Sequence, residues 1–154
     1  VDPFAEELAR GVAVNRLAIE RMLDNISTCW SYSRMPIVDR TIMAVALFEM
    51  FMQDDTPVSV AISEAVEISK LYGGDDSSNF VNGILGDVAR LAQENPGASL
   101  AVLANKVAEA AAEQKDTEVA EAADSVDELD EIEGDIEDDV EDIDDEAVVD
   151  GGLE

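Results

Sequence analysis

The segment from residue 57 to residue 92 constrains the fold most, because it encodes two helices joined by a tight turn. Apolar residues recur at helical spacing over residues 58–72. Gly73-Gly74 then permits a left-handed exit from the first helix, and Asp75 or Asp76 caps a second helix. Because so short a connector brings consecutive helices back against each other, the segment predicts a helical hairpin.

The remaining periodic segments also favour helices. Residues 4–27 carry their apolar side chains close to one face, which predicts one long amphipathic helix. Another helix is expected from about residue 36 to residue 52, and its apolar run predicts burial on most sides. Trp30, in the polar connector between them, is interpreted as an anchor against the bundle. No segment alternates with period two, so we predict an all-α fold, a compact helical bundle.

Two glycines inside predicted helices require an explanation, since glycine in a helix costs about 1 kcal/mol relative to alanine. Gly83 lies in the second helix of the hairpin. We expect it to allow a close approach between helices. Gly11, in the first predicted helix, is likewise expected to mark a tight contact.

The charge of the chain divides it into unlike parts. Its net charge is -28, and residues 116–154 contain 20 acidic residues and no basic one. The other 17 acidic residues and all 9 basic residues lie in residues 1–115. A segment this acidic buries too little apolar surface to offset its ordering entropy. We therefore predict a helical domain over residues 1–93, an extra alanine-rich helix within 94–115 and a disordered acidic tail over 116–154.

Composition argues against an enzyme. Histidine is absent, and the single Cys29 has no imidazole to activate it. No phosphate-loop or dinucleotide glycine pattern occurs, so neither a cofactor nor a metal is predicted. With one cysteine, no secretory signal and no apolar run long enough to span a bilayer, we expect a cytoplasmic chain without a membrane segment.

The string Phe80-Val81-Asn82-Gly83-Ile84-Leu85, preceded by Val60 to Glu67, closely resembles the hairpin of the NusB family of bacterial transcription antitermination factors. The resemblance covers roughly the first ninety residues and implies the helical bundle of that family. Family members begin earlier, with an arginine-rich helix that helps to bind RNA, so a chain that opens on Val1 is expected to be a fragment lacking the first helices. The matching residues are Phe80-Val81-Asn82-Gly83-Ile84-Leu85, the preceding Val60 to Glu67, Trp30, Arg34, Asp39-Arg40, Phe48-Glu49 and, more loosely, Glu7 to Val12.

The connector of the hairpin is the candidate RNA site. A helix start has free amides for phosphate, and aromatic rings stack on unpaired bases. Aromatic residues on apolar helix faces are also typical of a core, and a negative domain opposes phosphate binding. The resemblance implies that this corner forms part of the site for boxA RNA. Asn79 stands where many members have lysine or arginine, which predicts a weaker phosphate contact. The matching positions are Tyr72, Asp76, Ser77, Asn79 and Phe80.

A protein partner is implied by the same resemblance. Ribosomal protein S10, also called NusE, docks on this half of NusB-type proteins within the RNA polymerase antitermination complex. The residues expected at that contact are Asp39, Arg40, Arg34 and Glu64. From the residues alone, Asp39 is better explained as a first-turn carboxylate stabilised by its helix dipole, and Glu64 belongs equally to a solvated face.

The resemblance thus implies a transcription antitermination factor that binds boxA-type RNA with S10 and regulates ribosomal RNA transcription. Two alternatives stay open. One is the related RNA-recognition domain of ribosomal RNA cytosine methyltransferases, which a large catalytic α/β part would follow. The other is an all-helical protein-interaction module without RNA binding, which the negative charge and Asn79 favour.

Overall fold

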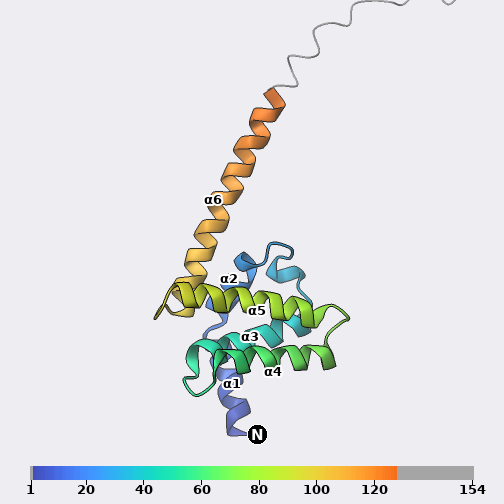
Figure 1. Ribbon diagram of the computed structural model, residues 1–154, viewed down its shortest axis with the longest axis vertical. Helices are drawn as coiled ribbons and strands as arrows, with labels where there is room; N and C mark the ends of the chain where they lie inside the picture. Colours follow the sequence, from blue (N-terminus) through green and yellow to red (C-terminus); the bar gives the residue numbers. More distant parts are fainter. Residues whose placement is uncertain (1, 128–154) are drawn as a thin grey trace, which may run out of the picture. The chain divides into compact units, whose positions relative to one another are not determined.

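The computed structural model describes residues 2–127 of the chain, and this part contains helices and no strand. The predicted all-α fold is confirmed. A short 3₁₀ helix, η1, precedes the third α-helix (Figure 1). In chain order the elements are α1 (Pro3–Val14), α2 (Arg16–Ile26), η1 (Tyr32–Arg34), α3 (Ile37–Met52), α4 (Val58–Tyr72), α5 (Ser77–Glu94) and α6 (Leu100–Asp127).

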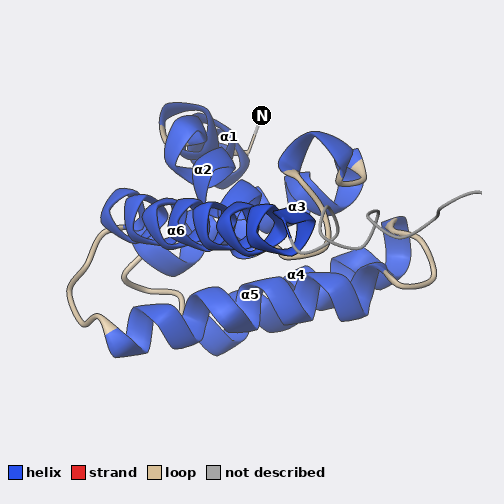
Figure 2. Cartoon of the chain, turned by 90° about the horizontal axis from the view of Figure 1, so that it is seen from above, coloured by secondary structure: helices blue, strands red, loops and turns tan. Residues whose placement is uncertain are grey.

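Helix α3 occupies the middle of the bundle. It packs against α1, α2, α4 and α5, while α4 and α5 pack against each other as the predicted hairpin (Figure 2). The expected burial of its apolar run is confirmed, because Met43 and Leu47 are fully buried. Other side chains with almost no exposed surface in this core are Ile19, Met22, Leu23, Val81, Leu85 and Val88.

The chain divides into two units, with the boundary between residues 116 and 117. Helix α6 begins in the first unit, where Leu100, Leu103 and Ala104 are fully buried in the core. It continues to Asp127, so the disorder predicted from residue 116 is corrected for residues 116–127. An alanine-rich sequence with high helix propensity explains the extension. The remainder of the predicted tail lies outside the described residues. Within residues 2–127, none of the helices combines the length and hydropathy needed to cross a bilayer.

The long helix predicted over residues 4–27 is wrong in one respect, because the structure divides it at Asn15 into α1 and α2. The side-chain amide of Asn15 donates a hydrogen bond to the carbonyl oxygen of Gly11 at 2.8 Å. Such a bond competes with the regular helical pattern. The tight contact predicted at Gly11 is confirmed, since a Cβ there would collide with the ring of Phe48.

The turn of the hairpin differs from its prediction in backbone conformation. Gly73 has φ -88° and an extended ψ, not a left-handed conformation. Its lack of a side chain is still required, because a Cβ would collide with Ser77 and with the carbonyl oxygen of Ser69. Among the described residues, the glycine with positive φ is Gly97, at 79°. The predicted cap is also corrected: Asp76 stands at the N-cap of α5 but makes no side-chain capping bond.

Gly83 does not have the role predicted for it. A Cβ at this position would find no atom within 4 Å, so no close approach of helices explains the glycine. Gly83 is exposed on α5. There it destabilises the helix relative to alanine, and no packing contact compensates for this.

Candidate functional site

The corner between α4 and α5 carries two aromatic rings with different exposure. Tyr72 is the last residue of α4, beyond the part of the helix that faces the core, and its side chain is 72% exposed. Phe80, one turn into α5, is half-buried and packs against the core cluster. The interpretation of both rings as core residues therefore fails for Tyr72 and holds in part for Phe80.

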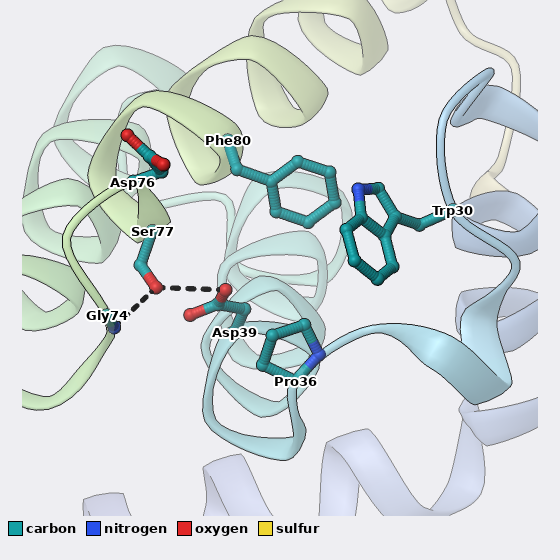
Figure 3. Close-up of a pocket in the computed structure, with 7 residues that line it drawn as sticks. All are labelled: Trp30, Pro36, Asp39, Gly74, Asp76, Ser77 and Phe80. Atoms are coloured by element: carbon teal, nitrogen blue, oxygen red, sulfur yellow. Dashed lines mark hydrogen bonds between the residues drawn. The ribbon is translucent and has the colours of Figure 1, made fainter.

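A chain of hydrogen bonds fixes this corner to the start of α3. The backbone amide of Gly74 donates to Ser77 Oγ at 2.8 Å, and Ser77 Oγ donates to Asp39 Oδ2 at 3.0 Å (Figure 3). Asp39 is only 3% exposed, and its Oδ1 has no hydrogen-bond partner within the described part of the chain. Since a buried carboxylate needs hydrogen bonds to offset its lost hydration, Ser77 couples the turn to α3.

A cavity of about 360 Å³ opens beside this hydrogen-bond chain. On one side the indole of Trp30 lies next to the ring of Phe80 (Figure 3). Trp30 is 50% exposed, so the predicted anchor is a partly solvated wall of the cavity. An open cavity with aromatic walls and polar groups at its base suits a flat, partly polar molecule. Its lining consists of Trp30, Pro36, Asp39, Gly74, Asp76, Ser77 and Phe80.

The start of α5 adds polar groups to the corner. Phe80 N–H bonds back to the carbonyl oxygen of Asp76, whereas the amides of Ser78 and Asn79 have no acceptor in the described structure. Free amides at a helix start attract anionic groups. Asp76 and Asn79 are both exposed beside them. No lysine or arginine occurs between residues 71 and 89, so the corner itself has no cationic side chain.

A second surface, the α3–α4 groove, runs along the outer face of these two helices. Two adjoining hollows of about 340 and 150 Å³ share Thr41, Ile42 and Ile68. Tyr72 lies at one end of the groove, and Glu49 and Glu64 lie at the other. Burial raises the pKa of Glu49 above its ordinary value, and the neighbouring charge of Glu64 raises it further. The groove is therefore apolar along its length and acidic at one end.

The four residues expected to bind a protein partner do not lie together. Glu64 lines the α3–α4 groove, and Asp39 is enclosed in the cavity at the corner. Arg40, the next residue, has its guanidinium 5.1 Å from the ring centre of Tyr32. Arg34 is exposed within η1. In contrast, the positions expected to bind RNA all lie at the α4–α5 corner.

Comparisons with known proteins identify the family and the fold of this chain. The sequence profile described as the NusB family matches residues 1–90. The chain belongs to the NusB family. A solved structure titled T. maritima NusB superimposes on it with a TM-score of 0.54 and 37% sequence identity, over 56% of this chain and 61% of that one. The NusB-like bundle implied by the sequence is thereby confirmed.

Curated NusB proteins match the same part of the chain. The transcription antitermination protein NusB of Heliobacterium modesticaldum is 44% identical over 94 residues, which is 61% of this chain and 46% of that protein. The protein of the same name from Geotalea uraniireducens is 48% identical over 88 residues, 57% of this chain and 61% of that protein. The chain thus spans about half to three-fifths of the length of these NusB relatives.

Sequence reasoning on this NusB-family chain missed three residues that line the cavity, Trp30, Pro36 and Gly74. Pro36 and Gly74 gave no signal. Both lie in connectors, where neither helical periodicity nor charge marks a residue as lining a site. Trp30 did carry a signal, since a tryptophan in a polar connector has no helix face to fill.

Proposed function

We propose that this NusB-family chain acts in transcription antitermination by binding boxA-type single-stranded RNA together with ribosomal protein S10 (NusE). In this proposal it joins the RNA polymerase antitermination complex, regulates ribosomal RNA transcription and acts by recognition without catalysis. The names of its relatives support the process. The observation that supports RNA recognition most directly is the corner of the hairpin, where α4 ends on the exposed ring of Tyr72 and α5 begins with free backbone amides.

The RNA would bind at the α4–α5 corner. Tyr72 supplies a platform for a stacked base, and Phe80 supplies the edge of a second one. The amides of Ser78 and Asn79 can donate to a phosphate, while the carboxylate of Asp76 can accept from an exocyclic amino group. Ser77 shapes the turn that presents these groups, because its hydroxyl bonds both Gly74 and Asp39.

S10 would bind the α3–α4 groove. The apolar walls favour a partner with apolar side chains, and Glu64 and Glu49 at one end favour a lysine or arginine there. In this arrangement Asp39 does not contact S10. It accepts the hydrogen bond from Ser77 that fixes the α4–α5 corner to the start of α3. Arg34 and Arg40 lie around Tyr32, away from the groove-lining residues of α3, so they belong to a different contact.

Titration of a fluorescently labelled boxA RNA tests the RNA site. Tyr72→Ala should weaken binding by about 1–3 kcal/mol, the usual contribution of one stacked base. Leu71→Ala is the matched control, because Leu71 is equally exposed on the preceding position of α4. Equal RNA affinities of the two variants would contradict the proposed site.

Capture of purified S10 tests the groove. Glu64→Lys should reduce capture, since it reverses the charge at the groove, whereas Glu67→Lys makes the same charge change on an exposed position outside the groove lining. If both variants capture S10 equally well, the groove is not the docking surface. A chain that captures S10 but binds boxA RNA at no salt concentration would favour the protein-interaction module, which the acidic charge of the domain supports.

A further inference from the structure

Eight of the nine basic residues of the first unit, all except Lys115 of α6, fall into two groups. Most are engaged: Lys106 donates to Asn95 Oδ1, and four others form ion pairs with acidic neighbours. Three arginines, each on a different element, have no carboxylate within 4 Å among residues 2–127. The ion pairs are Arg10 with Glu6, Arg16 with Glu20, Lys70 with Glu67 and Arg90 with Asp87, and the three unpaired arginines are Arg21, Arg34 and Arg40.

The three unpaired arginines gather around one aromatic residue, Tyr32. The guanidinium of Arg40, from α3, lies over its ring at 5.1 Å. Arg34 belongs to the same 3₁₀ helix, and Arg21 of α2 lines the same surface hollow of about 600 Å³ as Tyr32. We call these four residues the Tyr32 arginine cluster.

Neither acidic residue at this hollow forms an ion pair with an arginine of the cluster. Glu20 pairs with Arg16. Asp24 Oδ1 accepts the backbone N–H of Tyr32 at 2.8 Å, which fixes η1 against α2. The arginines of the cluster therefore keep their charge available to an external anion, in a chain whose net charge is -28.

One connector contributes residues both to the cluster and to the cavity at the α4–α5 corner. The segment between α2 and α3 carries Tyr32 and Arg34, and it also carries Trp30 and Pro36, which line the cavity of the corner (Figure 3). The half-exposed indole of Trp30 therefore lines the cavity of the corner and belongs to the same connector as Tyr32 and Arg34. A surface that alternates aromatic rings with arginines is typical of single-stranded nucleic-acid binding.

The corner needs such a surface if it binds RNA. It has no lysine or arginine of its own, and Asp75 and Asp76 lie at its edge. The affinity of proteins for RNA comes largely from neutralised phosphates. We propose that the Tyr32 arginine cluster binds the phosphates of the single-stranded RNA whose bases occupy the corner, with Trp30 stacking on a base between them. This inference rests on the proposed function and assigns Arg34 and Arg40 to RNA.

Salt-dependent titration of labelled boxA RNA with the full 154-residue chain tests the inference. The variant Arg21→Gln/Arg34→Gln removes two exposed arginines and keeps the Arg40–Tyr32 contact intact. The control Arg10→Gln/Arg90→Gln removes the same net charge from two exposed arginines that form ion pairs. Thermal unfolding of each variant checks that both remain folded.

At low salt the cluster variant should bind RNA on the order of tenfold more weakly than the control. Its slope of log affinity against log salt should be shallower than that of the control by about 1.4, since two phosphate contacts are lost. Trp30→Ala should weaken binding without changing this slope, because stacking releases no counterions.

Three outcomes overturn the inference. Equal affinities and slopes for the cluster variant and the control would remove the cluster from the RNA site, and the proposed function would stand if Tyr72→Ala still weakened binding. Loss of S10 capture without loss of RNA affinity would assign the cluster to the protein partner. A wild-type chain that binds boxA RNA at no salt concentration would overturn the inference and the proposed RNA recognition together.

Discussion

Gly11 and Gly83 both lie inside helices, yet a side chain would meet opposite surroundings at the two positions. At Gly11 a Cβ would enter the space filled by the Phe48 ring, which is only 7% exposed and has little room to move. At Gly83 a Cβ would enter open space. The sequence marks both residues as costly for a helix, but only the packing distinguishes a required glycine from a dispensable one.

Gly11→Ala should destabilise the fold by about 1–3 kcal/mol through overpacking. Gly83→Ala should stabilise it by about 0.5–1 kcal/mol, because alanine restricts the unfolded chain and favours the helix. Urea unfolding followed by circular dichroism measures both changes. Shifts of the same sign would contradict the surroundings described for these two glycines.

Glu49 gives the stability a dependence on pH. The folded chain raises the pKa of its carboxyl above 4.5, first through burial and then through Glu64. The folded state therefore binds the proton more tightly than the unfolded state, so this contribution to stability is present below pH 4.5 and is lost as pH rises through the raised pKa.

Glu49→Gln has no carboxyl to ionise, so it should not lose this stability as pH rises. The difference in unfolding free energy between Glu49→Gln and the wild type should therefore grow in favour of the variant from below pH 4.5 to neutrality. Glu64→Gln should give a smaller advantage, since burial of Glu49 remains. Urea unfolding across this pH range measures the difference. Parallel curves for wild type and Glu49→Gln would show that Glu49 does not titrate differently on folding.

The aromatic pair at the corner shows how far sequence reasoning reaches into the site. The hairpin pattern predicts both Tyr72 and Phe80 at the corner, and the structure has them at the end of α4 and in the first turn of α5. Their exposure followed from details that the pattern does not contain: α4 ends at Tyr72, whereas Phe80 follows one turn after α5 begins and faces the core. Tyr72 is exposed at the end of its helix, whereas Phe80 is partly buried because it lies within α5.

Helices were predictable as elements because each buries a periodic apolar face. Their limits were less predictable, since local hydrogen bonds decide them. The side chain of Asn15 divides α1 from α2, although the apolar face continues through both. The turn after α4 was correctly located, but its glycine serves close packing against Ser77 in place of a left-handed conformation. Local hydrogen bonds and close contacts of this kind cannot be predicted from the pattern of apolar residues.

Helix α6 contributes to the core although it lies beyond the part that matches the NusB family. Leu103→Ala should therefore destabilise the fold by about 2–5 kcal/mol, the usual effect of truncating a buried leucine. Val102→Ala is the control, since Val102 is 57% exposed, and it should change stability by less than about 0.5 kcal/mol. Thermal and urea unfolding compare the two. Equal effects would mean that α6 does not complete the core.

At the scale of the whole molecule, charge is distributed very unevenly. Residues 116–154 carry 20 of the 37 acidic residues and none of the 9 basic ones. A negative potential of this size repels RNA over distances comparable to the Debye length, about 10 Å at 0.1 M salt. The acidic segment should therefore lower the affinity of the chain for RNA in a salt-dependent manner.

Deletion of residues 116–154 should raise RNA affinity, and the increase should be largest at low salt. A second variant in which the acidic residues of this segment become asparagine and glutamine separates charge from length, and it should behave like the deletion. Fluorescence anisotropy with boxA RNA provides the affinities. If the affinity at low salt is unchanged in both variants, the segment has no electrostatic effect on RNA binding.

The central position of α3 also sets the order in which the bundle opens. Its backbone amides lie among four other helices, so they should exchange with deuterated solvent only when the entire first unit unfolds. Helix α1, which contains no buried residue, should instead lose its protection through local fraying. We therefore expect α1 to open far more often than α3 at ordinary temperature.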